Sequence, residues 1–267
     1  MRLPRKSPLS DKTIRHFAAS SCLVDAAIAA EGIWSPSALE NKVFGRGYSQ
    51  QKGTFKRMIK GIVPNDATAN RISKALNNRC DIKKWRDHPF WPLLLKRSVS
   101  DRETQAALLS IGEEVWPYVW NEFRPAYLAD CPYSRQAFTM KRIDAIAEIK
   151  TMDALFSLIA LGRQVREIGL EDEYIWAKYK SELMFADVIG KTPHLYICWK
   201  ALAARIRTVF WDYKGVKSPS NTQMIGTNEM EAQIEQAVKS ANNKGLLFPP
   251  RTLLDRQNRI VGNSSHL

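Results

Sequence analysis

Residues 45–91 read GRGYSQQKGTFKRMIKGIVPNDATANRISKALNNRCDIKKWRDHPFW, and this stretch decides the organisation of the chain. Apolar residues recur at helical spacing in its first half: Phe55, Met58, Ile59 and Ile62. The same spacing returns further on, at Ile72, Ala75 and Leu76. Because Gly61 and Pro64 break the pattern in between, the stretch predicts two short amphipathic helices joined by a turn, with these apolar residues on the buried faces.

The same stretch is strongly basic. From Arg46 to Arg86 it holds eleven lysines and arginines, at positions 46, 52, 56, 57, 60, 71, 74, 79, 83, 84 and 86. Only Asp66 and Asp81 oppose them, so the local net charge is +9. Residues 1–100 hold 19 basic and 7 acidic residues, which accounts for +12 of the formal net charge of +13. This segregation predicts a phosphate-binding surface attached to a nearly neutral second region.

Nine residues of the stretch follow a recognisable order, in which a polar helix ends at a glycine, a proline follows, and an Ile-x-x-Ala-Leu helix closes the core. They are Ser49, Thr54, Phe55, Lys60, Gly61, Pro64, Ile72, Ala75 and Leu76. In this order, residues 45–77 resemble the second half of the helix-turn-helix of phage-repressor and Cro-type regulators. The segment departs from that family in its longer spacing from Ser49 to Gly61 and in lacking a clear alanine-glycine turn in the first helix of the motif. The resemblance implies sequence-specific binding to double-stranded DNA.

A helical wheel divides the candidate reading helix into two faces. With the apolar residues inward, the outward residues are Gln50, Gly53, Arg57 and Lys60, flanked by Thr54 and Lys56. Gln50 and Arg57 are expected to read base edges, because glutamine suits adenine and arginine suits guanine. The expected phosphate contacts are Lys52, Lys56 and Lys60, and Thr54, Arg71 and Lys74 complete the predicted interface. The alternative is a solvated basic helix that touches no base.

Aromatic residues follow among basic ones: Trp85, Phe90 and Trp91 beside Lys83, Lys84 and Arg86. Such a mixture can form a platform on which unpaired bases stack. Pro89 and Pro92 favour instead a rigid, packed connection between domains. His88 belongs to this connection, since one histidine before a proline makes no metal site.

The remaining sequence is helical nearly throughout. Upstream, one helix is expected over 12–30 and another from Ser35-Pro36 to Gly45. From Asp101 onward, the expected helices are 101–113, 114–129, 134–150, 151–169, 171–189, 192–214 and 229–243, with a polar linker over 216–228 and an irregular last twenty residues. The fold class is therefore all-α, with an N-terminal helix-turn-helix-like module followed by a larger helical domain. The predicted ranges are 1–92 for the basic module, 93–215 for the helical bundle, and 216–267 for the linker, short helix and tail.

Signals for catalysis or metal binding are weak. Asp144, Glu148 and Lys150 match a spacing found in metal-dependent nucleases, but the isoleucines around them predict a helix with an exposed acidic edge. His194 and Cys198 lie one helical turn apart with no second pair to complete a zinc site. The four cysteines show no paired spacing, and no uncharged apolar run reaches the ~18–20 residues of a membrane span. We expect a cytoplasmic protein with no catalytic residue, no metal, no cofactor and no membrane contact.

The function predicted from the sequence is that of a non-enzymatic DNA-binding regulatory protein acting on transcription. Its partners are double-stranded DNA and a second copy of the chain, because helix-turn-helix readers commonly bind two half-sites as dimers. The alternative is a helical interaction or effector protein of a mobile element or phage-defence system, whose basic face binds RNA or a protein. Both alternatives imply steep salt dependence, whereas only a base reader prefers its site by roughly 10³-fold or more.

Overall fold

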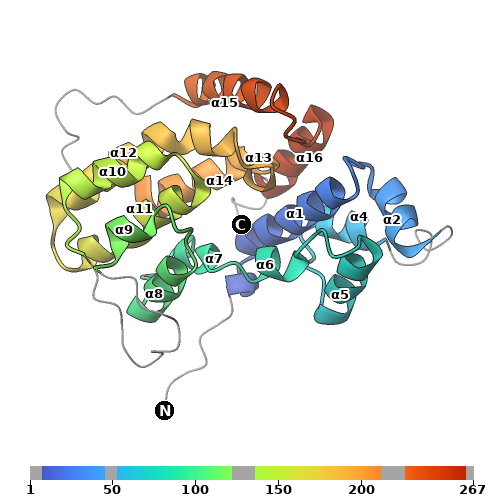
Figure 1. Ribbon diagram of the computed structural model, residues 1–267, viewed down its shortest axis with the longest axis horizontal. Coiled ribbons are helices and arrows are strands. Elements are labelled where there is room, and N and C mark those ends of the chain that lie inside the picture. The colour runs from blue at the N-terminus through green and yellow to red at the C-terminus, as the bar shows by residue number, and fades with distance from the viewer. Residues whose placement is uncertain (1–7, 46–52, 122–135, 212–225, 263–267) are drawn as a thin grey trace, which may run out of the picture. The chain divides into compact units, whose positions relative to one another are not determined.

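The computed structural model describes residues 8–45, 53–121, 136–211 and 226–262. Within these ranges the chain is all-α and contains no strand, which confirms the predicted class (Figure 1). No helix in the described ranges is long and apolar enough to cross a membrane. The chain divides into two compact units. The N-terminal unit comprises Met1–Leu95, Thr192–Arg205 and Ser240–Leu267, and the second unit comprises Lys96–Lys191 and Ile206–Lys239.

Two segments late in the chain belong with the N-terminal unit, which differs from the predicted ranges. Residues 192–205 were expected in the helical bundle. Residues 240–267 fall in the predicted range 216–267, with a helix over 229–243 and an irregular last twenty residues. The tail instead contains helix α16 (Arg251–Gly262), which begins directly after Pro249-Pro250. Helix α16 therefore lies within the last twenty residues, which were expected to be irregular, and it buries Leu253, Leu254 and Gln257.

Helix α1 (Lys12–Ala29) is the central element of the N-terminal unit. Asp11 begins it, because its side chain accepts hydrogen bonds from the backbone N–H groups of Thr13 and Ile14. The helix packs against α4, α6, α13 and α16. Small side chains that are fully buried allow these close approaches: Ala18, Ala19, Ser20, Ser21, Cys22, Ala26 and Ala27. From His16 to Val24 the helix is thus enclosed on all sides.

The other helices of residues 1–95 are α2 (Pro36–Phe44), α4 (Thr54–Ile59), α5 (Asp66–Ala75), α6 (Ile82–Arg86) and α7 (Phe90–Leu93), preceded by the 3₁₀ turn η1 (Pro8–Ser10). Among them, α4 and α6 pack on α1, α2 packs on α4 and α5, and α5 packs on α6. In Figure 1, α2, α4 and α5 lie together on one side of α1. Helix α2 begins at Ser35 and Pro36 as the sequence predicts, with the Ser35 hydroxyl accepting a hydrogen bond from the N–H of Ala38.

The helix expected over 192–214 is broken into three pieces. They are α13 (Pro193–Tyr196), α14 (Trp199–Ile206) and the π-helical turn η2 (Arg207–Trp211). The N–H of Cys198 donates to Leu195 O, a tighter i to i−3 pattern that interrupts the α-helix. His194 of α13 stacks on Trp85 at 4.0 Å between ring centroids and lies 3.1 Å from Asp25. The break in the helix therefore coincides with contacts that hold α13 against Trp85 and Asp25.

The second unit is a bundle built on two long helices. Its helices are α8 (Asp101–Leu109), α9 (Trp116–Val119), α10 (Met140–Ile149), α11 (Met152–Glu167), α12 (Glu171–Ile189) and most of α15 (Thr227–Asn242). Helices α11 and α12 pack against each other, and α10 packs on both. Asp144 of the nuclease-like spacing accepts a hydrogen bond from Trp176 Nε1 and pairs with Lys180 at 2.8 Å. Its carboxylate thus links α10 to α12.

Gly162 provides a sharp test of packing in the second unit. A Cβ at this position of α11 would lie 2.5 Å and 2.7 Å from two ring carbons of Phe210. We expect Gly162→Ala to destabilise the protein by about 1–3 kcal/mol, because the ring or the helix must shift. Gly226→Ala is the control, since nothing lies within 4 Å of its added Cβ. Urea unfolding checks this, and equal midpoints for the two variants would contradict the packing.

His88 makes stability depend on pH. The imidazole is buried and accepts the N–H of Phe90 at Nδ1, and burial, reinforced by Lys84, lowers its pKa to about 4. The unfolded chain therefore binds the proton near pH 6.5 while the folded chain does not, so stability falls as the pH drops below that value.

This single group is expected to remove about 2 kcal/mol of stability between pH 7 and pH 5. His88→Asn keeps an acceptor for Phe90 N–H and should reduce this loss. Urea midpoints measured across the pH range check the expectation, and the same pH dependence in wild type and variant would refute it.

Candidate nucleic-acid interface

Helix α4 is short, and the apolar side chains of its buried face anchor it to the neighbouring helices. Phe55, Met58 and Ile59 are buried against α1 and α2, as the sequence predicts. Gly61 ends the helix at a φ of +78°, and its N–H donates to Met58 O. The next residue, Ile62, donates its N–H to Arg57 O, which closes the C-terminal turn.

The outward face of α4 carries the predicted cations. Lys56, Arg57 and Lys60 are exposed, and no ion pair joins them to an acid within the described part of the chain. Thr54 begins the helix and is half-buried. The predicted contacts Gln50 and Lys52 lie outside the described residues, as does Ser49. The structure thus presents three basic side chains on one exposed helical face.

The structure differs from the sequence prediction at Ile62. It was expected to point inward with Phe55, Met58 and Ile59, but it is 43% exposed. The positive φ of Gly61 turns the chain out of the helical path, so the wheel no longer applies after Lys60. Ala75 is likewise exposed on α5, whereas Ile72 and Leu76 are buried.

A buried carboxylate joins α2 to the start of α4. Glu40 is only 1% exposed, and its two oxygens accept the backbone N–H groups of Thr54 at 2.8 Å and Phe55 at 2.9 Å. The residue at the helix start, Gly53, adopts a left-handed conformation and supplies no side-chain cap. Glu40 therefore replaces the missing cap from a neighbouring helix. These two amides are therefore not available to an anion at this surface.

Aromatic stacking fixes the position of Arg71 on α5. Its guanidinium carbon lies 4.9 Å above the ring centroid of Phe44, the last residue of α2. Phe44 in turn packs on Phe55 of α4, with the ring centroids 6.1 Å apart. This column connects α5, α2 and α4, and it holds Arg71 near α4. Lys74, one turn further along α5, is exposed.

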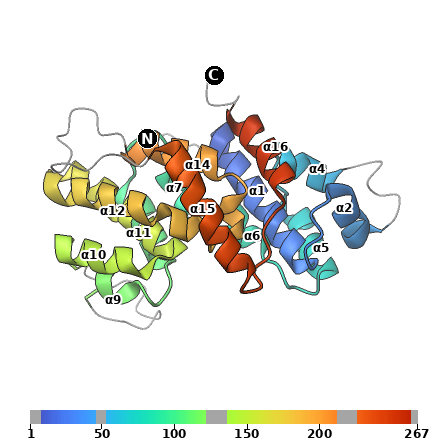
Figure 2. The same ribbon diagram turned by 90° about the horizontal axis from the view of Figure 1, so that it is seen from above.

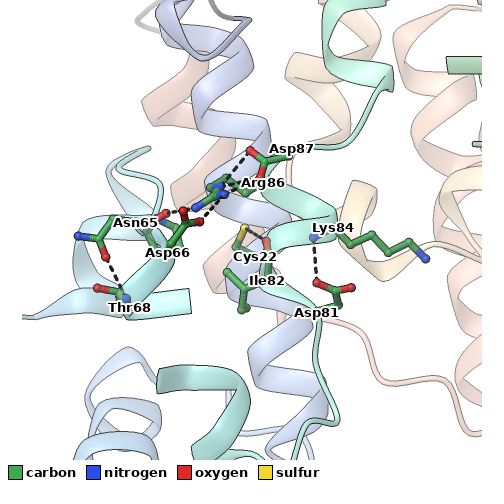
Figure 3. A network of polar contacts seen from close by, with 10 residues as sticks. Cys22, Asn65, Asp66, Thr68, Asp81, Ile82, Lys84, Arg86 and Asp87 are labelled. Atoms are coloured by element: carbon green, nitrogen blue, oxygen red, sulfur yellow. Dashed lines mark hydrogen bonds and ion pairs between the residues drawn. The ribbon is translucent and has the colours of Figure 1, made fainter. Parts of the chain in front are cut away.

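Arg86 of the basic stretch serves the fold. Its guanidinium contacts Asp66 at 2.8 Å, donates to Pro64 O at 3.2 Å and pairs with the adjacent Asp87 (Figure 3). Hydrogen bonding to Asp87 raises the pKa of Arg86, and the same guanidinium lowers the pKa of Asp66. This network ties the start of α5 to the end of α6 (Figure 3). Arg86 is therefore not available to a phosphate.

The aromatic cluster after residue 84 is packed within the N-terminal unit. Trp85, Phe90 and Trp91 are 7%, 1% and 2% exposed. The indole N–H of Trp91 donates to Trp85 O at 2.7 Å, and the Trp91 ring packs 6.4 Å from that of Phe17. Buried rings cannot stack on bases, so the platform alternative is wrong for these residues.

The role of Glu40 was not predicted from the sequence. A signal was present, because Glu40 lies beside Leu39 and one turn before Val43 on the buried face of α2. A charged residue on such a face needs a partner, and the uncapped start of α4 provides two donors.

Comparison with known proteins adds no relative: no family model, no curated protein and no solved structure matches this chain.

Removing the Glu40 carboxylate should release α4. We expect Glu40→Ala to cost about 2–4 kcal/mol, because two partly or fully buried N–H groups lose their acceptors. Glu40→Gln, which keeps one acceptor oxygen, should cost less. Asn41→Ala is the control because Asn41 is exposed on the same helix. Urea unfolding measures all three variants, and an Ala variant as stable as the Asn41 control would rule out the capping role.

Proposed function

We propose that this chain is a DNA-binding regulatory protein that docks α4 in the major groove of double-stranded DNA. The observation that carries the proposal is the exposed basic face of α4, with Lys56, Arg57 and Lys60 turned away from a buried apolar face. A helix held by a preceding helix, with its side chains directed at the groove, is the docking mode of helix-turn-helix proteins. In this scheme α2 is the preceding helix and α4 the reader.

The division of labour follows from side-chain chemistry. Arg57 reads guanine, because its planar guanidinium can donate to both O6 and N7. Lys56 and Lys60 bind phosphate, since a lysine ammonium is a compact charge without fixed directionality. Arg71 and Lys74 of α5 extend the phosphate contacts beside α4. Gln50 and Lys52, which precede α4, remain predicted contacts for adenine and for phosphate.

The test is selection of bound sequences from a pool of random duplex DNA. We expect wild type to retain a motif with a site preference of roughly 10³-fold or more over random duplex. Arg57→Ala should reduce the preference by about 10–100-fold at one motif position, because each base contact contributes about 1–3 kcal/mol. Arg102→Ala is the control, because it removes the same charge from an exposed position of α8. It should leave the motif and the site preference unchanged.

Lysine variants separate phosphate contacts from base contacts. Lys60→Ala should weaken binding to all duplexes alike and reduce the slope of log affinity against log salt by about 1. The absence of any motif, or an unchanged motif in Arg57→Ala, would contradict the proposal. Tighter binding of structured RNA or of an acidic polypeptide at the same salt would favour the helical effector protein instead.

A further inference from the structure

The C-terminal helix α16 packs against α1 through a buried polar contact. Gln257 is fully buried, and its Oε1 lies 2.6 Å from Nε2 of His16. His16 is itself 4% exposed. Both views show α16 beside α1 (Figures 1 and 2). A residue near the end of the chain thus reaches the part of α1 on which α4 rests.

The other edge of the His16 ring meets the end of α4. A Cβ at Gly61 would lie 2.8 Å from His16 Nδ1 and 3.3 Å from His16 Cα. Gly61 is therefore pressed directly on this histidine, and its positive φ sets the direction in which the chain leaves α4. His16 lies between Gln257 on one side and the C-terminal turn of α4 on the other.

The contact defines the tautomer of the ring. When Gln257 Oε1 accepts, the proton is on Nε2, and Nδ1 is the bare nitrogen that faces Gly61. Burial lowers the pKa of His16, a shift that the Gln257 hydrogen bond opposes and Lys12 assists, so the neutral ring is favoured. Loss of Gln257 would leave a buried N–H without its acceptor, and the ring would then turn or move.

We propose that Gln257 is a positioning residue for the DNA-reading face of α4 and acts through His16. The inference rests on the proposed function of α4. Helix α4 spans only Thr54–Ile59, and its last turn is closed by the hydrogen bond from Ile62 to Arg57. A displaced His16 shifts Gly61 and with it the backbone that carries Arg57 and Lys60. Base reading needs geometry held within ~0.5 Å, whereas phosphate contacts by flexible lysines tolerate such a shift.

The experiment uses the full chain and two duplexes, one with the selected motif and one random, over a series of salt concentrations. We expect Gln257→Leu to lower the site preference by about 10-fold or more with an unchanged salt slope, because base contacts weaken and phosphate contacts remain. Gln257→Glu keeps an acceptor for His16 and should retain the preference. Thr252→Ala, on the exposed face of α16, is the matched control. A wild-type preference in Gln257→Leu overturns the proposal.

Amide hydrogen exchange supplies a readout that does not depend on DNA. In Gln257→Leu, the amides of Arg57, Lys60 and Gly61 should exchange faster, while those of α6 keep their protection. Exchange that increases in α16 alone overturns the proposal. If wild type shows no site preference, the proposed function fails, and the exchange pattern still decides whether α16 holds α4. Should Gln257→Leu not fold, Gln257→Asn, whose amide is too short to reach His16, takes its place.

Discussion

The burial of α1 from His16 to Val24 is the constraint on which the N-terminal unit depends. These nine consecutive buried residues leave no face of the stretch for water, so every side of it must be covered by another element. Covering it recruits α4 and α6 from the early sequence and α13 and α16 from the last third of the chain. Ala18, Ala19 and Ser20 set the close approach, and a larger side chain at any of them would separate the neighbours. The late segments are therefore part of the core and not an appendage to it.

Helix α4 exists because of its surroundings. An isolated helix of six residues is not stable in water, since helices shorter than about 12–15 residues are marginal even in favourable sequences. Here Glu40 supplies the cap, Phe55 and Met58 supply the apolar anchor, and Gly61 over His16 fixes the exit. A helix that is fixed at both ends and anchored through its buried face presents its exposed side chains in a defined direction. Such rigidity is what base reading requires and what a merely solvated helix lacks.

The sequence predicted helices well where apolar residues recur at helical spacing within one segment. Helix α12 matches its expected range of 171–189, and the buried positions of α4 were identified except at Ile62. What sequence reasoning missed depends on contacts distant in the chain. The carboxylate of Glu40 and the pair His16–Gln257 join segments whose proximity no spacing reveals. Helix α16 lies in the last twenty residues, which were expected to be irregular. The composition predicted a positively charged surface. Only the structure shows which cations are exposed, such as Lys56 and Lys60, and which are paired within the fold, such as Arg86.

The acidic residues of the N-terminal unit explain why its cations remain available. Each of the seven acids of residues 1–100 already has a partner within the N-terminal unit. Asp11, Glu40 and Asp81 accept backbone N–H groups at helix starts, Asp25 binds His194 and the N–H of Asp81, Glu31 pairs with Arg79, and Asp66 and Asp87 pair with Arg86. None of them neutralises Lys56, Arg57 or Lys60 in the described part of the chain. Because these carboxylates already have partners within the N-terminal unit, the positive charge of Lys56, Arg57 and Lys60 stays available to an anion from outside the chain.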